Sequence, residues 1–423
     1  MTKGLFLARA FYLAGHKVIG LDFKQRCIPS SGRYSRALSK HYAIQTPSSD
    51  EEYVEKLKEI IQEEKIDLWV CVSGVATTMK DAKAKRKIES ETCKVFQLEP
   101  EICGILDDKH RFIEKTKEIR LMAPATKLVK SHDEALAFLD KKEPNQYILK
   151  SVQLDDTSRA DMTLYPRETL QETTTIISGL RITDDKPWIF QEFVEGKEYC
   201  THAVVVRGRV KAFVVCPSSE LLMHYRALPA DSKHSRKILE FTERYASGLK
   251  ERNLTGQPSG PEDGEGITGQ LSFDFIVKEI NGKLQLYPIE CNPRTHTAVV
   301  LFNTDAQRLA GCYLSLLDDP EAPPLDVYIP DSTSGFYWIG HDIVTLLFLP
   351  LLNISDFSSF YHNLKELIEH VLHWKEATFE VWDPVPFLIL YHVYWPRLFL
   401  RSILKWEKWS RINVSTTKMF KCS

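Results

Sequence analysis

The sequence predicts an α/β protein that continues into an α+β part. The α/β part is predicted from residues 4–97, where helical segments alternate with short buried strands. The α+β part is predicted from a hairpin signal, because two apolar runs, residues 271–277 and 284–294, flank the pair Asn281-Gly282. The chain has 423 residues, which is too many for one ordinary core, so we expect two to three domains.

Composition excludes several classes of protein. The formal net charge is −2, so no general nucleic-acid footprint is present and we expect no nucleic-acid partner. The nine cysteines are scattered, odd in number and without a C-x-x-C pair. They predict buried thiols in a reducing compartment rather than a disulfide framework or a cysteine zinc site. No secretory signal pattern is visible at the start, so we expect a cytoplasmic protein.

The first hundred residues predict a Rossmann-like layer. Its elements follow in order: a helix over 5–13, a strand over 18–22, a helix over 51–64, a strand over 66–73, a helix over 75–91 and a strand near 95–97. The strand and glycine-rich turn that would precede the first helix are not seen, which indicates a chain that begins late, through a truncated gene model or a real variation. Without that strand and turn, the pattern is weak evidence for a nucleotide-binding site, and a layer with a purely structural role is the better interpretation.

Three segments then carry charged side chains at the ends of predicted elements. Residues 101–117 predict one helix that includes Lys109 and Arg111, which alone would be a charged helix face. Residues 147–151 predict a strand that contains Lys150. Residues 187–199 predict a strand, a glycine turn and the start of a second strand, a pattern that is also common in solvated hairpins.

The hairpin predicts a metal site. Asp274 lies midway along its first strand, and Glu290 and Asn292 lie two residues apart near the end of the second. Side chains two apart on a strand share a face, so two carboxylates and an amide oxygen are presented together, which suits Mg²⁺ held against phosphates. Arg294 just beyond them suits an anion. Solvated acids on an edge hairpin are the alternative; the apolar flanks disfavour it. Cys291 alternates with these residues and is expected to pack on the opposite face.

The segment Glu290-Cys-Asn-Pro-Arg294, with Asp274 before it, resembles the metal-binding end of the ATP-grasp family. Four signals occur in the family's order, and the resemblance covers about residues 5–310. It implies an ATP-grasp fold, with a Rossmann-like N-terminal domain, a lid subdomain and a catalytic domain with a helical extension. The implied boundaries are 1–100 for the first, 101–200 for the lid with the adenine hinge, 201–330 for the metal subdomain and 331–423 for the extension.

The resemblance also implies roles for individual residues. ATP would be the nucleotide, with Mg²⁺ or Mn²⁺ bound by Asp274, Glu290 and Asn292. Lys109, for which Arg111 is the runner-up, would contact phosphates together with Lys150, and Arg294 would assist the transfer. The lid loop 155–161 lacks the family's glycines, so its contacts would come from Ser158 and Arg159. The remaining nucleotide-binding positions are the adenine hinge and the ribose acid: Gln191, Glu192, Phe193, Val194 and Glu198.

Residues 331–423 contain two apolar runs, 343–352 and 385–400, which are too short or too interrupted to span a bilayer. A basic, tryptophan-containing tail follows to residue 411, so the segment 385–411 predicts peripheral membrane contact through a surface helix. A helix packed on the core with a basic edge is the favoured alternative. The segments 338–342 and 380–384 resemble ATP-grasp ligases similar to mycosporine-glycine synthase.

The resemblance implies a carbon–nitrogen ligase of specialised metabolism. Such an enzyme activates a small carboxylate or vinylogous acid with ATP and joins it to an amine, often an amino acid. Two alternatives remain open: an ATP-binding, membrane-associated protein with impaired catalysis, and an enzyme of carbamoyl-phosphate or carboxylase chemistry. The expected partners are the small-molecule acid and amine, and no pattern indicates an oligomeric state.

Overall fold

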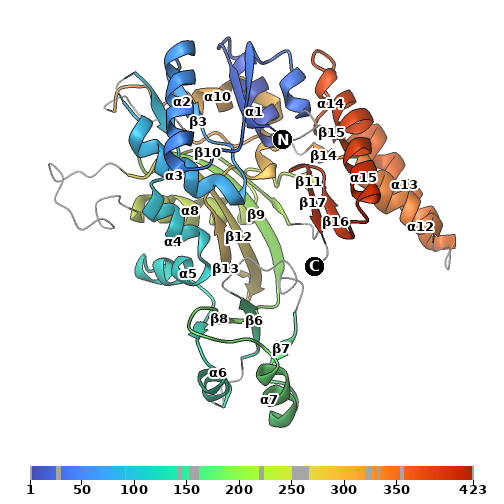
Figure 1. Cartoon of the computed structure of the whole chain (residues 1–423). Helices are drawn as coiled ribbons and strands as arrows, with labels where there is room; N and C mark the ends of the chain where they lie inside the picture. Colours follow the sequence, from blue (N-terminus) through green and yellow to red (C-terminus); the bar gives the residue numbers. More distant parts are fainter. Residues whose placement is uncertain are drawn as a thin grey trace. The chain divides into compact units, whose positions relative to one another are not determined.

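The computed structural model describes residues 2–24, 30–90, 92–140, 145–151, 162–218, 223–249, 266–320, 326–331, 334–352 and 357–421. The chain divides into two compact units (Figure 1). The first comprises residues 1–100, 200–272 and 293–423, and the second comprises residues 101–199 and 273–292. Each unit is described by itself.

The first unit begins with the predicted alternation of helices and strands. Two parallel strand pairs are formed, β1 with β2 and β3 with β4. The Ser49 side chain caps the second helix by accepting a hydrogen bond from the Glu52 amide, which starts the helix at Asp50. The strand predicted over 66–73 is confined to three residues. The elements are α1 (Thr2–Leu13), β1 (Ile19–Phe23), η1 (Ser31–Tyr34), β2 (Lys40–Ile44), α2 (Asp50–Glu64), β3 (Leu68–Val70), α3 (Val75–Ile88) and β4 (Lys94–Phe96).

Long strands form a four-stranded sheet in the order β10-β9-β12-β13. The strands are β9 (Lys197–Val206), β10 (Arg209–Pro217), β12 (Gly269–Ile280) and β13 (Lys283–Asn292). In the first unit, Val204 belongs to a core that also contains Phe302 from η3 (Thr297–Asp305) and Tyr313 from α10 (Ala306–Leu314). All three side chains are fully buried, so apolar burial holds these segments together. Helix α8 (Lys233–Gly248) belongs to the same unit.

The C-terminal extension is helical, as predicted, and packs within the first unit. Its elements are α11 (Ile339–Asp342), η4 (Ile343–Phe348), α12 (Leu349–Leu352), α13 (Phe357–His373), α14 (Val385–Ile389), η5 (Leu390–Tyr394) and α15 (Trp395–Leu404). The strands are β11 (Tyr225–Arg226), β14 (Gly335–Tyr337) and β15 (Lys375–Glu376), which form one sheet, and the pair β16 (Trp409–Asn413) and β17 (Lys418–Lys421).

The apolar run at 385–400 is a packed helix rather than a helix lying wholly on a surface. Leu390, Tyr394 and Trp395 are buried in the core of the first unit. The helix ends at Leu404, and the tail turns into the strand β16, so the helix predicted to continue to residue 411 is wrong in that part. Among the described residues, no helix has the length and apolarity needed to cross a bilayer.

A buried ion pair joins the extension to the start of the chain. Arg9 on α1 donates from Nε to Asp383 Oδ2 at 2.9 Å and from Nη2 to the Asp383 carbonyl at 2.7 Å. The Asp383 carboxylate also accepts from Ser35 Oγ at 2.6 Å and from the Arg36 amide at 2.9 Å. The Asp383 side chain is fully buried, so the three donors to its carboxylate compensate its lost hydration, and all four hydrogen bonds fix the extension against the N-terminal segment.

The second unit contains a four-stranded antiparallel sheet in the order β5-β8-β6-β7. Its core is aromatic, with Tyr147, Tyr165 and Phe190 buried together. The elements are α4 (Pro100–Asp107), α5 (Lys109–Glu118), β5 (Thr126–Val129), α6 (His132–Leu139), β6 (Tyr147–Ser151), β7 (Leu164–Tyr165), α7 (Leu170–Ser178) and β8 (Trp188–Glu192).

The single helix predicted over 101–117 is two helices. Asp108 leaves the helical conformation, with φ −89° and ψ 114°, and its side chain accepts a hydrogen bond from the Arg111 amide. An aspartate in that geometry is an N-cap, so it ends α4 and starts α5. Lys109 is therefore the first residue of a new helix rather than a residue in the middle of a long one.

Candidate functional site

The hairpin of β12 and β13 turns at Asn281 and Gly282, whose φ values are 51° and 74°. Both residues lie in the left-handed region, which asparagine and glycine tolerate and which two-residue hairpin turns of type I′ require. The register that follows sets which side chains share a face. Cys291 is buried, as its alternation with Glu290 and Asn292 predicted.

Asp274, Glu290 and Asn292 converge on one face of this hairpin. Asn292 Nδ2 donates to Asp274 Oδ2 and to Glu290 Oε1, each at 3.2 Å. One amide therefore bridges two carboxylates. All three side chains are partly buried, so the acidic pair is held together without full exposure to water.

Lys109 completes this cluster from α5. Its Nζ lies 3.1 Å from Glu290 Oε2. The helix is held against the hairpin by Phe112, which stacks on Phe273 with ring centroids 6.0 Å apart. Burial acts to raise the pKa of Glu290, but the Lys109 charge and hydrogen bonds from its neighbours lower it to about 2. Glu290 is therefore an anion at neutral pH.

Lys150 approaches the same group from the antiparallel sheet. Its Nζ donates to Gln191 Oε1 on β8 at 2.9 Å. Burial, together with the charge of Lys109, lowers the pKa of Lys150 to about 8, and the opposing charges of Glu290 and Glu198 only partly offset these effects. Two lysines and two glutamates therefore interact electrostatically within the second unit.

The segment after β8 is the predicted adenine hinge. The Glu192 amide donates to the Ala125 carbonyl at 2.8 Å, and the Phe193 amide donates to the Gln146 carbonyl at 2.7 Å. The Glu192 carboxylate accepts from the Ala125 amide at 2.9 Å. At two of the three predicted hinge positions, Glu192 and Phe193, the backbone amide therefore donates to the protein itself.

A close approach fixes the turn that follows. A Cβ at Gly196 would lie 2.6 Å from the Val277 carbonyl oxygen of β12, nearer than real Cβ atoms come to backbone. Only glycine fits there without displacing the strand. The turn delivers Glu198 to the start of β9, where its charge acts on Lys150.

Three predicted site residues remain, and the structure describes one of them, Arg294. Arg294 belongs to the first unit, where its carbonyl accepts from Ser272 Oγ at 3.1 Å. In the same unit Lys3 donates to the Thr295 carbonyl at 2.8 Å, and burial, then the Arg294 charge, lowers the pKa of Lys3 to about 8. The sequence offered no signal for Lys3, because it is a lone lysine on a helix. Ser158 and Arg159 lie outside the described residues.

No protein-family model and no curated protein sequence matches the chain. Several solved structures are similar to the chain. N5-carboxyaminoimidazole synthetase from Staphylococcus aureus is similar with a TM-score of 0.50 and 15% identity, over 74% of this chain and 75% of that one. A biotin carboxylase from Campylobacter jejuni, in complex with β-γ-ATP, is similar with a TM-score of 0.51 and 12% identity, over 76% and 70%.

A third similar structure is the biotin carboxylase domain of 2-oxoglutarate carboxylase from Hydrogenobacter thermophilus, bound to MgADP, ADP and bicarbonate. Its TM-score is 0.50 and its identity 13%, over 78% of this chain and 70% of that one. At these low identities the three similarities show that the chains share a fold, and they show nothing about substrates.

Proposed function

Because the chain has the ATP-grasp fold, we propose that it is an ATP- and Mg²⁺-dependent carbon–nitrogen ligase. The observation that carries the proposal is the convergence of Asp274, Glu290 and Asn292 with Lys109. Acidic oxygens beside a lysine form a site for a metal–polyphosphate complex, since the metal requires anions and the phosphates require a cation. We further propose that the chain is organised as four domains, with boundaries at 1–100, 101–200, 201–330 and 331–423.

The donor set fits Mg²⁺. Two carboxylates and an amide are the hard oxygen ligands that this ion takes together with phosphate oxygens. In the present arrangement Asn292 offers Nδ2 to the acids, so its amide must turn to present Oδ1 to a metal, and Lys109 must release Glu290. When bound, Mg²⁺ neutralises phosphate charge and aligns the γ-phosphate for transfer.

The chain's own residues supply the rest of the ATP site. Lys109 and Lys150 stabilise negative charge on the transferred phosphoryl group, Val194 donates its amide to adenine, and Glu198 accepts from ribose hydroxyls. The ion pair of Lys109 with Glu290 and the hydrogen bond of Lys150 to Gln191 keep both lysines in place before ATP binds. The acceptor acid then attacks the γ-phosphorus through an oxygen, ADP leaves, and an amine displaces phosphate from the activated carbon.

The acceptor class we propose is a small carboxylic or vinylogous acid, with an amino acid as the amine. The resemblance of segments 338–342 and 380–384 to mycosporine-glycine synthase-like ligases supports this choice. The test is a coupled assay of ADP release by the purified chain, with panels of acids and amines. We expect release that needs Mg²⁺ and an acid, and condensed product only when an amine is added. ATP binding without release across the panels would favour the alternative of an impaired enzyme.

A second candidate is carboxylation or carbamoyl-phosphate chemistry. It is favoured by the similar structures that are carboxylases, one of them bound to bicarbonate. Bicarbonate in the same assay separates the two candidates. ADP release that rises with bicarbonate and needs no other acid would assign the carboxylase chemistry, and unchanged release would remove it.

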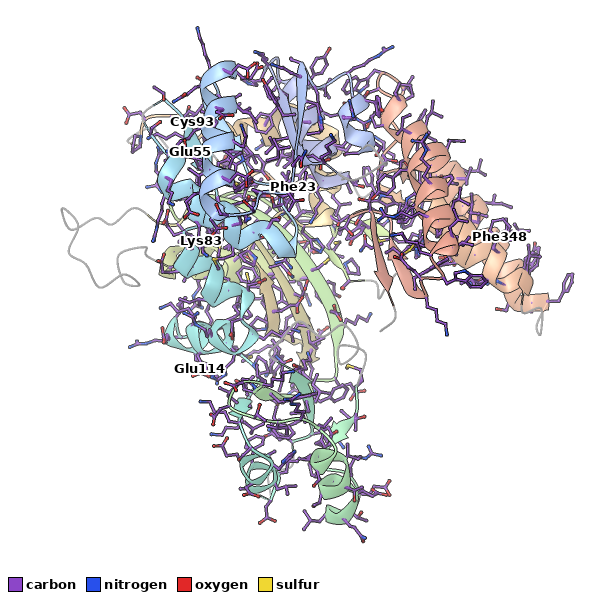
Figure 2. The ribbon with its side chains drawn as sticks, viewed as in Figure 1. Phe23, Glu55, Lys83, Cys93, Glu114 and Phe348 are labelled. Carbon is purple, nitrogen blue, oxygen red and sulfur yellow. The ribbon has the colours of Figure 1, made fainter. Side chains whose placement is uncertain are left out.

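We also propose that the chain touches membranes peripherally through the end of α15, in an otherwise cytoplasmic protein. Leu400, Ile403, Leu404 and Trp406 are exposed there, Trp406 by 92% of its surface, beside exposed Arg401. Phe348 on η4, labelled in Figure 2, is another exposed aromatic side chain of the first unit. Apolar side chains beside basic ones suit an anionic lipid surface.

Sedimentation with vesicles rich in phosphatidylserine checks this contact. We expect the chain to pellet with the vesicles at low salt and to be released by high salt, because the attraction of basic residues is screened. Trp406→Glu with Leu404→Glu should lower the bound fraction several-fold. Leu170→Glu on α7 is the control and should bind as the parent does, because Leu170 is 65% exposed, close to the 71% of Leu404. A chain that stays in the supernatant at low salt would contradict the contact.

A further inference from the structure

Two histidines and two carboxylates gather in the first unit, among residues that the proposed ligase chemistry does not use. His224 precedes β11, Asp342 ends α11, and Glu366 and His370 lie one turn apart on α13. One side-chain ligand atom from each of His224, Glu366 and His370 lies within 4.8 Å of the other two. We propose that these three residues bind a divalent transition-metal ion, with Zn²⁺ as the best fit.

Asp342 orients both histidines. Its Oδ1 lies 2.8 Å from His224 Nε2, and its Oδ2 lies 2.7 Å from His370 Nδ1. A carboxylate that accepts from one ring nitrogen fixes the tautomer, so the lone pair lies on the other nitrogen, which is the arrangement that second-shell carboxylates impose on metal-binding histidines. Here a single carboxylate orients two imidazoles, which lie with ring centroids 4.3 Å apart.

The spacing suits a small ion. His370 Nε2 lies 3.9 Å from Glu366 Oε1, which is too long for a hydrogen bond. Tetrahedral zinc with bonds of about 2.0–2.2 Å places its ligand atoms about 3.3–3.5 Å apart, so a small rotation of Glu366 closes the site. Glu366 is the most exposed of the three ligands, with 37% of its side chain accessible, so it has room for that movement.

Charge balance points to a dication. Asp342 is fully buried, and the side chains of His224 and His370 are 9% and 5% exposed. The Asp342 carboxylate lies in a dry environment, where nearby positive charge offsets the cost of burying it. A divalent ion supplies two positive charges. Two imidazoles with one carboxylate favour Zn²⁺ or another transition metal over Mg²⁺, which prefers oxygen ligands.

Aromatic rings enclose the cluster on one side. Trp374 lies with its ring centroid 4.4 Å from that of His370 and 5.7 Å from that of His224. Tyr337 approaches His370 at 5.8 Å. A Cβ at Gly335 would overlap the Trp374 ring, so glycine there allows the indole its position. This apolar wall limits the access of water and strengthens metal–ligand electrostatics.

The test is metal binding by the full chain after treatment with a chelator and removal of the chelator. Titration with Zn²⁺, followed by calorimetry, should show one site per chain, and Co²⁺ should give the visible absorption of a low-coordinate nitrogen–oxygen site. A large excess of Mg²⁺ should not displace either ion. Zn²⁺ should also raise the melting temperature, because it binds the folded chain only.

Variants decide between this site and adventitious binding. Glu366→Gln changes a partly exposed side chain, so the fold is retained, and it should weaken Zn²⁺ binding at least tenfold. His370→Gln should abolish it, and Asp342→Asn should weaken it by about 10–100-fold through lost orientation. Glu369→Gln and His373→Gln, exposed on the same helix, are matched controls and should bind as the parent does. No stoichiometric binding, or equal binding by Glu366→Gln and Glu369→Gln, would overturn the proposal.

Discussion

Replacing Glu290 by alanine or glutamine should reduce Mg²⁺-dependent ADP release by about 10²–10³-fold, the scale of losing one group that stabilises the transferred charge. Glu290 contacts both Lys109 and Asn292, so its loss removes a carboxylate from the proposed metal position and also frees the lysine. The measurement is the coupled assay at saturating ATP, repeated over a range of Mg²⁺ concentrations.

The matched control is Glu279→Gln. Glu279 is an exposed glutamate near the end of β12, on the same hairpin, so the variant loses the same charge without touching the cluster. It should release ADP at the parent rate. Thermal unfolding of both variants separates loss of chemistry from loss of fold. A Glu290→Gln enzyme that turns over at the parent rate while folded would refute the metal assignment.

The affinity of the chain for ATP should fall as the pH rises above about 8. Lys150 has its pKa lowered to about 8 by burial and by the charge of Lys109. Below that pH the ammonium is charged and attracts phosphate; at pH 9 only about a tenth of it remains charged in the ATP-free protein, so binding must recharge it. We therefore expect the dissociation constant of MgATP to rise by up to about tenfold between pH 7 and pH 9.

Variants of Lys150 isolate this effect. Lys150→Met should bind weakly at every pH and lose most turnover, and Lys150→Arg, whose charge persists, should flatten the pH dependence. Lys127→Met, on the exposed edge of the same sheet, is the control and should keep the parent profile. The lowered pKa of Lys150 also affects the stability of the fold. Between pH 8 and 10.5 this lysine binds more protons in the unfolded chain than in the folded chain. The contribution of Lys150 to the free energy of unfolding therefore increases as the pH rises through this range. A pH profile for ATP binding that Lys150→Arg leaves unchanged would contradict the assignment.

Some of the site could be read from local pattern. The hairpin, its turn at Asn281-Gly282 and the shared face of Glu290 and Asn292 follow from a period of two and a turn that needs positive φ. These properties depend on neighbours in sequence. The prediction of one helix over 101–117 failed because an N-cap depends on backbone geometry at one residue, and Asp108 adopts that geometry in a segment whose charge pattern continues through it.

The sequence by itself determined the fold class and the hairpin that brings Asp274, Glu290 and Asn292 to one face, because periodicity and turn chemistry depend on neighbouring residues. Only the tertiary structure decided which distant side chains meet. Lys150 finds Gln191 across 41 positions, and His224 finds Asp342 across 118. Such contacts depend on the path of the whole chain. The pKa of Lys150 depends in the same way on burial by distant segments. Neither can be predicted from the residues that flank it in sequence.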